Sequence, residues 1–264
     1  MKEFFDVTVL AVLQGVAEFL PVSSSGHLVI LQHVFEVPEA VRLRLEVFLH
    51  AGTLLSIFAF YWSRIRTLAR GALRLDGPVS AYAAWFYLAR LFVSALPAVG
   101  VYFVLHDAID GLVSQARLVG GLLIFTGLVL VGTRFLPTGR KSVGFLQALL
   151  MGLGQALALL PGVSRSGMTL AVARGARIAP EAAAEFSFLM SAPLILGGVL
   201  LEFVKGDVGT GDLSLGVLLW GTVLSAGVGY LSLALLLKAL KGSWFWLFGP
   251  YCLIVGLCTM FFCR

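Results

Sequence analysis

The 264-residue chain is 59% hydrophobic and only 12% charged, and its formal net charge is +5 at pH 7. A soluble domain of this size could not cover so much apolar surface, so the composition excludes a soluble globular protein. The apolar segments are long enough for membrane helices, and the small positive charge lies in short loops, which is typical of membrane orientation and not of nucleic-acid binding. We therefore expect a single all-α integral membrane domain over residues 1–264.

A polar turn interrupts the first apolar region. The pattern is helical from about Phe4 to Phe19, Pro21 breaks it, and a second helical piece runs from about Ser24 to Phe35. Each piece is shorter than the roughly 20 residues that a full crossing needs. Two short helices joined by Pro-Val-Ser-Ser-Ser-Gly predict a re-entrant hairpin, which enters and leaves the membrane on one side.

Further along the chain, the apolar segments are long enough to cross a membrane. We expect about six spanning helices, near residues 45–62, 84–105, 118–135, 183–203, 215–237 and 244–262. The links at 63–80, 134–141 and 238–241 are basic, whereas those at 107–110 and 205–212 are acidic. Because cationic loops favour the cytoplasm, we expect the basic links inside and the acidic links outside.

A second broken helix resembles the first. Helical pieces near 145–160 and 168–176 flank a turn that reads Pro-Gly-Val-Ser-Arg-Ser-Gly. Aligning Ser23–Gly26 with Ser164–Gly167 also brings Gln14 onto Gln155, so the two segments are related copies. With the orientation above, the hairpins enter from opposite sides and their turns meet near mid-membrane. This is an inverted-topology repeat, with repeats near 4–105 and 118–262.

Arg165 stands in the second turn, just before a helix. Free backbone amides at a helix start bind anions, and the helix dipole adds to this attraction. The guanidinium matches phosphate oxygens, and the hydroxyls of Ser164, Ser166 and Thr169 add donors. A buried Arg needs an anion, which Glu18 would supply at rest and a phosphorylated ligand during turnover. The alternative is a purely structural Arg–Glu pair.

The first turn carries the groups for proton transfer. Ser24 and His27 lie three apart at a helix start and share a face, and His is the usual base for a serine nucleophile. Gln14 and Glu18 lie four apart and point toward the same turn. Glu18 would orient His27, act as an acid or base, or hold a divalent cation with Gln14 and a phosphate, and the residues leave these roles open.

Two further polar side chains, His50 and Glu46, lie in an apolar segment after the first turn. His50 and Glu46 lie four apart in an apolar segment, where titratable side chains are costly and commonly functional, so they are candidates of a second rank. Ser and Gly also serve contacts between membrane helices, so the alternative for the first turn is a polar packing seam.

At these residues the chain resembles the undecaprenyl-diphosphate phosphatase family of bacteria, the BacA-type enzymes linked to bacitracin resistance. The resemblance rests on Gln14-Gly-Val-Ala-Glu-Phe-Leu-Pro-Val-Ser-Ser-Ser-Gly-His27 and on Pro161-Gly-Val-Ser-Arg-Ser-Gly-Met-Thr169. The run Glu185-Phe-Ser-Phe-Leu is also similar to the family. Length, hydropathy and the repeat agree from end to end.

The resemblance implies a membrane phosphatase that converts undecaprenyl diphosphate to undecaprenyl phosphate and inorganic phosphate, which recycles the cell-wall lipid carrier. It implies a multi-pass protein of the bacterial inner membrane, with a site open to the periplasmic side and helped by Mg²⁺ or Ca²⁺. Glu18 and Gln14 are the candidate ligands of that cation. The family has Glu or Gln at the first motif position, so Gln14 leaves Glu18 as the only carboxylate of the motif.

The resemblance also assigns roles to the two turns. The nucleophile maps to the Ser23–Ser25 cluster, in which we favour Ser24 with His27 as its partner. Ser25 and water remain alternatives as nucleophile. The family's arginine maps to Arg165. The groups expected to contact substrate or phosphate are Gln14, Ser23, Ser25, Ser164, Ser166 and Thr169.

Two other functions remain open at this stage. Paired re-entrant hairpins in an inverted repeat are also a feature of transporters, so a polyprenyl-phosphate transporter or flippase is the main alternative. An ion channel or structural membrane protein is the third. The expected partners are the polyprenyl diphosphate substrate and membrane lipid, with no nucleic acid, and a homodimer is one option for the oligomeric state.

Overall fold

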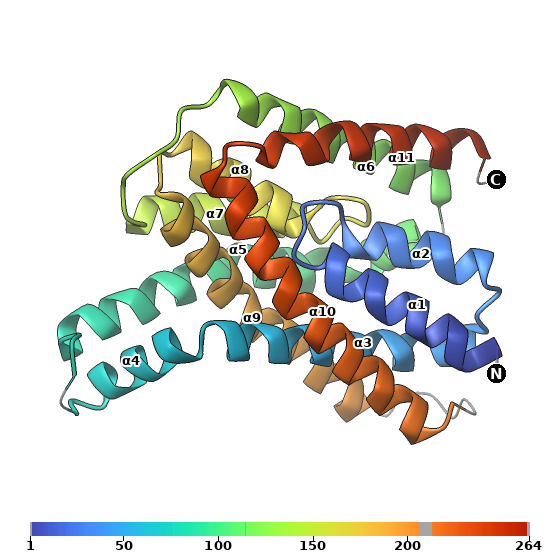
Figure 1. Ribbon diagram of the computed structural model, residues 1–264, viewed down its shortest axis with the longest axis horizontal. Helices are drawn as coiled ribbons and strands as arrows, with labels where there is room; N and C mark the ends of the chain where they lie inside the picture. The colour runs from blue at the N-terminus through green and yellow to red at the C-terminus, as the bar shows by residue number, and fades with distance from the viewer. Residues whose placement is uncertain (1, 76, 114, 206–212, 263–264) are drawn as a thin grey trace.

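A computed structural model describes residues 2–75, 77–113, 115–205 and 213–262, and over these residues the chain is helical with no β-strand. Figure 1 shows helices such as α3, α6 and α11 running close to the longest axis of the molecule, with α10 crossing them obliquely. The all-α prediction is therefore confirmed. The helices are α1 (Lys2–Ala17), α2 (Ser24–Val34), α3 (Glu39–Phe60), α4 (Trp62–Ala72), α5 (Ala81–Val113), α6 (Ala116–Gly132), α7 (Phe145–Leu157), α8 (Arg165–Gly175), α9 (Pro180–Lys205), α10 (Leu215–Lys241) and α11 (Phe248–Phe262).

Five helical segments in the described residues are long and apolar enough to cross a membrane. They are 41–60, 81–105, 116–135, 180–202 and 215–241. The sixth predicted crossing, 244–262, is shorter than expected because Phe245–Leu247 form a separate 3₁₀ turn before α11. The 15 residues of α11 span about 22 Å at 1.5 Å per residue, less than a hydrocarbon core of about 30 Å.

The predicted links differ from the structure in two places. The basic link 63–80 contains helix α4, which buries Leu68 and Gly71 and carries arginines on its other faces. Helix α5 continues to Val113 through the predicted acidic link at 107–110. Both links therefore lengthen the bundle instead of forming loops. The other acidic link, 205–212, lies almost entirely outside the described residues.

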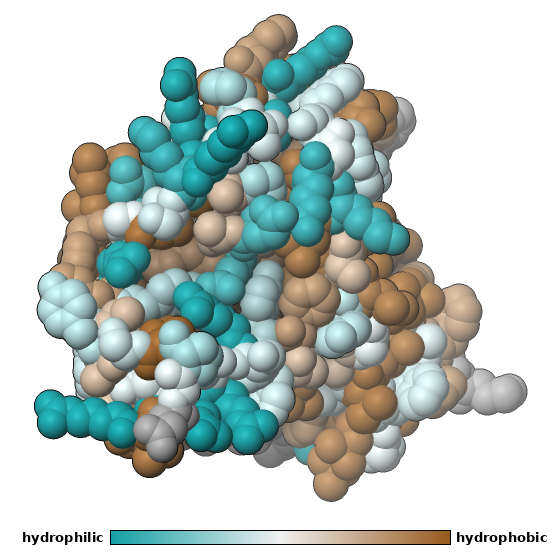
Figure 2. Space-filling view, turned by 60° about the vertical axis from the view of Figure 1, so that its left-hand side comes forward, coloured by the Kyte–Doolittle hydropathy of each residue, from teal (hydrophilic) through white to brown (hydrophobic). Residues whose placement is uncertain are grey.

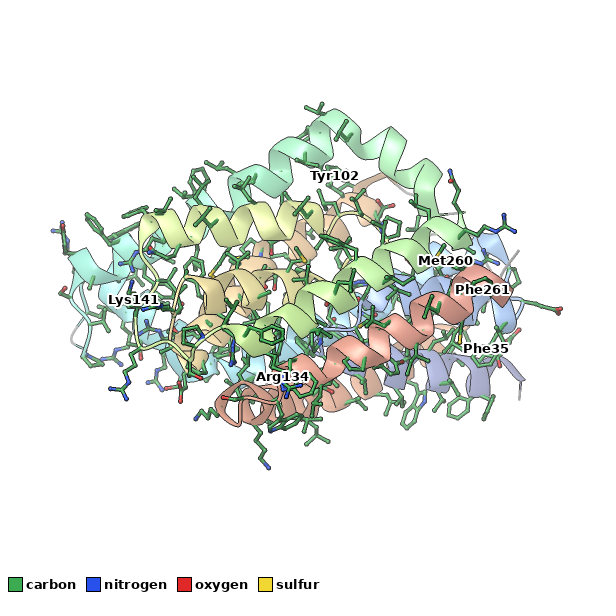
Figure 3. All side chains as sticks on the ribbon, turned by 90° about the horizontal axis from the view of Figure 1, so that it is seen from above. Phe35, Tyr102, Arg134, Lys141, Met260 and Phe261 are labelled. Carbon is green, nitrogen blue, oxygen red and sulfur yellow. The ribbon has the colours of Figure 1, made fainter. Side chains whose placement is uncertain are left out.

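Charge and hydrophobicity are separated over the surface. Large apolar side chains such as Phe92, Val223 and Phe261 are exposed, as expected of a surface that faces lipid. Figure 2, which brings the left-hand end of Figure 1 forward, shows hydrophilic side chains gathered over this end and hydrophobic ones on the flank. Figure 3 shows Lys141 at this end and Phe35 and Met260 at the other.

The two polar turns touch each other inside the bundle. Figure 1 shows hairpin α1–α2 reaching its turn from the right and hairpin α7–α8 reaching its turn from the left. The hydroxyl of Ser166 donates to the carbonyl of Leu20 at 3.3 Å, which ties the second turn to the first. A Cβ added to Gly26 would lie 3.3 Å from Cα of Gly162, so the two backbones are in close contact.

Helices α6 and α11 pack closely along a seam of glycines. A Cβ added to Gly120 would lie 2.8 Å from the carbonyl oxygen of Gly256, and one added to Gly249 would lie 2.7 Å from that of Gly127. Small residues let membrane helices approach to backbone contact, where dispersion forces are strongest. This pair forms one side of the space that holds the turns.

Candidate active site

The carboxylate of Glu18 is the centre of a buried polar cluster. Nη2 of Arg165 donates to its Oε1 at 2.5 Å, which joins the two turns by an ion pair. Its Oε2 accepts the hydroxyl of Ser24 at 2.8 Å and Nε2 of Gln14 at 3.1 Å. A charge buried at this depth is stable only when it is paired and hydrogen-bonded. Four predicted site residues thus meet at one carboxylate.

Arg165 begins helix α8, and its neighbour Ser164 caps that helix. The hydroxyl of Ser164 accepts the backbone N–H of Gly167 at 3.1 Å. Capping fixes the direction in which α8 leaves the turn. Nη1 of Arg165 is buried and has no hydrogen-bond partner in the described residues. It is the donor most suited to an incoming anionic oxygen.

The other hydroxyls of the second turn hold the turn together. Ser166 lies 3.3 Å from the hydroxyl of Ser164. Thr169 lies 2.6 Å from the hydroxyl of Ser187 on α9 and donates to the carbonyl of Arg165 at 2.9 Å. These bonds are internal to the protein. A contact of Ser164, Ser166 and Thr169 with phosphate stays a prediction.

Thr126 on α6 is a site residue that sequence reasoning missed. Its hydroxyl donates to the carbonyl of Gly162 at 3.0 Å and accepts the backbone N–H of Ser164 at 3.1 Å. One buried side chain therefore fixes the backbone on both sides of Val163, directly before Arg165. The signal was available in the sequence, since Thr126 is the one hydroxyl residue of this helix and the only polar side chain after Arg117.

Replacing Thr126 by valine is expected to loosen the second turn. The change keeps the shape of the side chain but leaves a buried N–H and a buried carbonyl unpaired, at about 1–3 kcal/mol for each group. We expect a lower melting temperature and a lower kcat, because Arg165 loses its fixed backbone. Thr126→Ser keeps the hydroxyl and should retain both properties. If Thr126→Val keeps the melting temperature and kcat of Thr126→Ser and of the wild type, the hydroxyl is not needed.

His27 is held away from the serine that it was predicted to activate. Its Nδ1 faces the carbonyl of Ser23 at 2.9 Å and its Nε2 faces the hydroxyl of Tyr251 at 2.9 Å. The His27 and Tyr251 rings also stack at 5.6 Å. A nitrogen that faces a carbonyl must carry the proton, so the Tyr251 hydroxyl donates to Nε2. The hydroxyl of Ser24 turns to Glu18 instead.

Ser23 and Ser25 flank the serine of the cluster. Ser23 is buried with φ of +69°, a left-handed conformation that is strained for a residue with a Cβ and is often found at functional sites. Its hydroxyl accepts the backbone N–H of Gly26 at 3.4 Å and lies 3.4 Å from that of Ser25. Ser25 is exposed. A role of either side chain in binding phosphate stays a prediction.

His50 also reaches the cluster, from helix α3. Its Nε2 lies 3.7 Å from Oε2 of Glu18, and its Nδ1 faces the backbone carbonyl of Glu46 at 2.9 Å. The Glu46 side chain instead accepts Nε2 of Gln32 at 2.9 Å. Of the two candidates of second rank, His50 thus approaches the Glu18 carboxylate.

Glu185, from the third motif, belongs to a separate polar group. It accepts Nε of Arg64 at 2.8 Å and the hydroxyl of Tyr87 at 2.9 Å. The Arg64 guanidinium lies 4.8 Å from the centre of the Tyr87 ring. These contacts join α4, α5 and α9, so the third motif ties helices together here.

Few protein oxygens near Glu18 and Gln14 are free to bind the predicted divalent cation. Both carboxylate oxygens of Glu18 are bound by other side chains, one of them the guanidinium of Arg165. The amide oxygen of Gln14 has no hydrogen-bond partner in the described residues, which contain no group of three or more His, Cys, Asp or Glu side chains placed to hold a metal. Mg²⁺ and Ca²⁺ take about six or more oxygen ligands. These residues do not fit a cation held by the protein itself.

The chain matches known proteins along nearly its whole length. The profile described as bacitracin resistance protein BacA matches residues 7–258. An undecaprenyl-diphosphatase of Pelotomaculum thermopropionicum is 37% identical, over 97% of this chain and 95% of that protein. Proteins of the same name from Salinibacter ruber and Methanosphaera stadtmanae are 36% and 35% identical, over 96% and 98% of this chain and 97% and 98% of their own lengths. Motifs, helices and relatives agree, and the chain belongs to the bacitracin resistance protein BacA family.

Proposed function

We propose that the protein is a membrane phosphatase that hydrolyses undecaprenyl diphosphate to undecaprenyl phosphate and inorganic phosphate. The observation that carries this proposal is the buried Arg165, with Nη2 on Glu18 and Nη1 without a protein partner in the described residues. A buried donor of this kind suits a phosphate oxygen. The names of the relatives support a diphosphatase over the transporter alternative.

The chemistry follows from the bonds around Glu18. The Ser24 hydroxyl already donates to the carboxylate at 2.8 Å, so Glu18 can take its proton while Oγ attacks the terminal phosphorus. The bond from that phosphorus to the bridging oxygen breaks, and undecaprenyl phosphate leaves with the electron pair. Arg165 balances charge on the transferred group. Water then hydrolyses the phosphoserine and restores Ser24. Direct attack by water, activated at the same carboxylate, remains the alternative.

The substrate's two parts suit a site at this position. The apolar tail can stay in the bilayer, while the diphosphate reaches the cationic and hydroxyl donors of the two turns. A divalent cation that assists the reaction would arrive bound to the diphosphate, because the protein offers few oxygens to hold it alone. Chelation should then weaken turnover without unfolding the apoprotein.

The arrangement of the two hairpins also supports a proposal for how the chain lies in the membrane. We infer that α1–α2 and α7–α8 are re-entrant hairpins of two inverted repeats, near 4–105 and 118–262, in one domain. Their approach from opposite ends in Figure 1 supports this. Arginines of α4 lie at one end, which favours a cytoplasmic position for that end and a site open to the periplasm. A homodimer stays a prediction.

A phosphate-release assay tests the function. The purified protein, in detergent with Mg²⁺ or Ca²⁺, is expected to release inorganic phosphate from undecaprenyl diphosphate. Undecaprenyl phosphate at the same concentration is the matched control and should release none, because the leaving group of the proposed reaction is a phosphate. Well-folded protein that leaves the diphosphate intact would contradict the proposal.

A further inference from the structure

We propose that His50 is the proton acceptor behind Glu18, taking the part that a second carboxylate at position 14 would take. This inference rests on the proposed phosphatase function. It assigns a role to a histidine outside both polar turns, and it explains how the site works with Gln14 in place of an acid.

Three side chains surround the same carboxylate oxygen. Oε2 of Glu18 accepts the Ser24 hydroxyl at 2.8 Å and Nε2 of Gln14 at 3.1 Å, and it lies 3.7 Å from Nε2 of His50. Ser24 is the proton donor of this group, and the Gln14 amide cannot accept a proton at neutral pH. His50 is therefore the neighbour of Oε2 able to receive it. The distance is longer than a hydrogen bond, as is common before substrate tightens an active site.

The tautomer of His50 points its lone pair at the carboxylate. Nδ1 faces the carbonyl of Glu46 at 2.9 Å and carries the hydrogen, so in the neutral imidazole that the proposed step requires, the lone pair is on Nε2. His27 has the same tautomer, but its Nε2 already accepts the Tyr251 hydroxyl. Of the two histidines His27 and His50, His50 is thus the one whose Nε2 faces Glu18.

Glu18 needs a second acceptor because of its own partner. The guanidinium of Arg165 on Oε1 is the counter-ion of the ionised carboxylate, so passing the proton on restores that ion pair. An imidazole holds a proton more tightly than a carboxylate in water. In the proposed step, the proton passes from Ser24 to Oε2 of Glu18 and then to Nε2 of His50. The Ser24 oxygen forms its bond to the terminal phosphorus as the bond from that phosphorus to the bridging oxygen breaks, and undecaprenyl phosphate leaves with the electron pair. His50 then passes the proton to solvent. The side chain of His50 is 30% exposed, which gives it that route.

Substitution of His50 separates this role from a structural one. In the phosphate-release assay, we expect His50→Gln and His50→Ala to lower kcat by about 10²–10³-fold with little change in KM, the usual effect of losing an acid–base group. Gln keeps a polar side chain of similar reach, so a structural role would survive that change. Added imidazole should raise kcat of His50→Ala, since the site is partly exposed, and should not help Ser24→Ala.

The sharpest test moves the titratable group to the other neighbour of Oε2. The double variant Gln14→Glu with His50→Gln should regain most of the kcat that His50→Gln loses. A matched control is Thr222→Val on α10, whose hydroxyl donates to the Phe48 carbonyl on α3, so it disturbs the same helix without contacting Glu18. Its kcat should stay near the wild-type value. Melting temperatures of all variants show whether they are folded.

Each outcome bears on one proposal. Folded His50→Gln with wild-type kcat would overturn the role of His50 and leave the phosphatase intact. A loss that neither imidazole nor Gln14→Glu relieves would also overturn it and assign a structural role. Wild-type protein without phosphate release would instead contradict the proposed function.

Discussion

Alanine at position 165 is expected to abolish phosphate release. Arg165 bridges the two turns through Glu18 and keeps Nη1 for the substrate. An arginine that stabilises a transferred phosphoryl group contributes about 10³–10⁵-fold to kcat, so we expect a loss of at least about 10³-fold. Arg165→Lys keeps the positive charge but loses the planar guanidinium, so its kcat should lie between those of the wild type and Arg165→Ala. The assay is phosphate release at saturating undecaprenyl diphosphate.

Folding must be separated from catalysis in this experiment. Without Arg165 the buried Glu18 carboxylate loses its guanidinium partner and keeps the hydrogen bonds from Ser24 and Gln14. Removing one partner of a buried ion pair costs about 3–5 kcal/mol in known cases. Arg174→Ala is the matched control, since Arg174 lies in the last turn of the same helix and donates to the carbonyl of Leu136. That control should remain active. Folded Arg165→Lys and Arg165→Ala with full kcat would defeat the assignment.

Loss of the Ser24 hydroxyl is expected to have an effect of similar size. If Oγ is the nucleophile, Ser24→Ala should lower kcat by at least about 10³-fold, because nothing else at that point forms the covalent bond. Acid quenching of the wild-type enzyme during turnover, followed by peptide mass spectrometry, should find phosphate on Ser24. Glu18→Gln should prevent the phosphoserine from forming, because it removes the proton acceptor.

The neighbouring serine gives the comparison. Ser25 is exposed and its contact is with Ser23, so Ser25→Ala should change KM more than kcat. Substantial turnover by Ser24→Ala, together with no phosphopeptide in the quenched wild type, would favour attack by water. That result would keep Glu18 and Arg165 in place and change only the identity of the nucleophile.

The sequence was sufficient to predict the pairing at the centre of the site. An acid and a guanidinium in apolar sequence are so costly to bury apart that they can be expected to meet, and Glu18 and Arg165 do. The helical class and most spans followed from hydropathy in the same way. The repeat and the re-entrant hairpins stay proposals, although the two turns touch.

Partners contributed from distant helices could not be predicted. The spacing of Ser24 and His27 favoured a bond between them, but α11 brings Tyr251 to His27 and the compact first turn brings Ser24 to Glu18. Local spacing carries no information on which helix packs beside a turn. The position of Thr126 depends on packing in the same way. The length of the last helix also escaped prediction, because the 3₁₀ turn before it depends on local backbone geometry.

The glycine seam between α6 and α11 determines how far apart the two turns can be. Thr126 on α6 holds the second turn, and Tyr251 on α11 holds His27 of the first. Because both supports stand on one closely packed helix pair, a side chain forced between these helices would displace donors on both turns at once. The distance between the two turns, which a bound diphosphate must fit, is thus set by the glycines that pack α6 against α11. A change in that packing would move both turns, and neither turn could restore the distance alone.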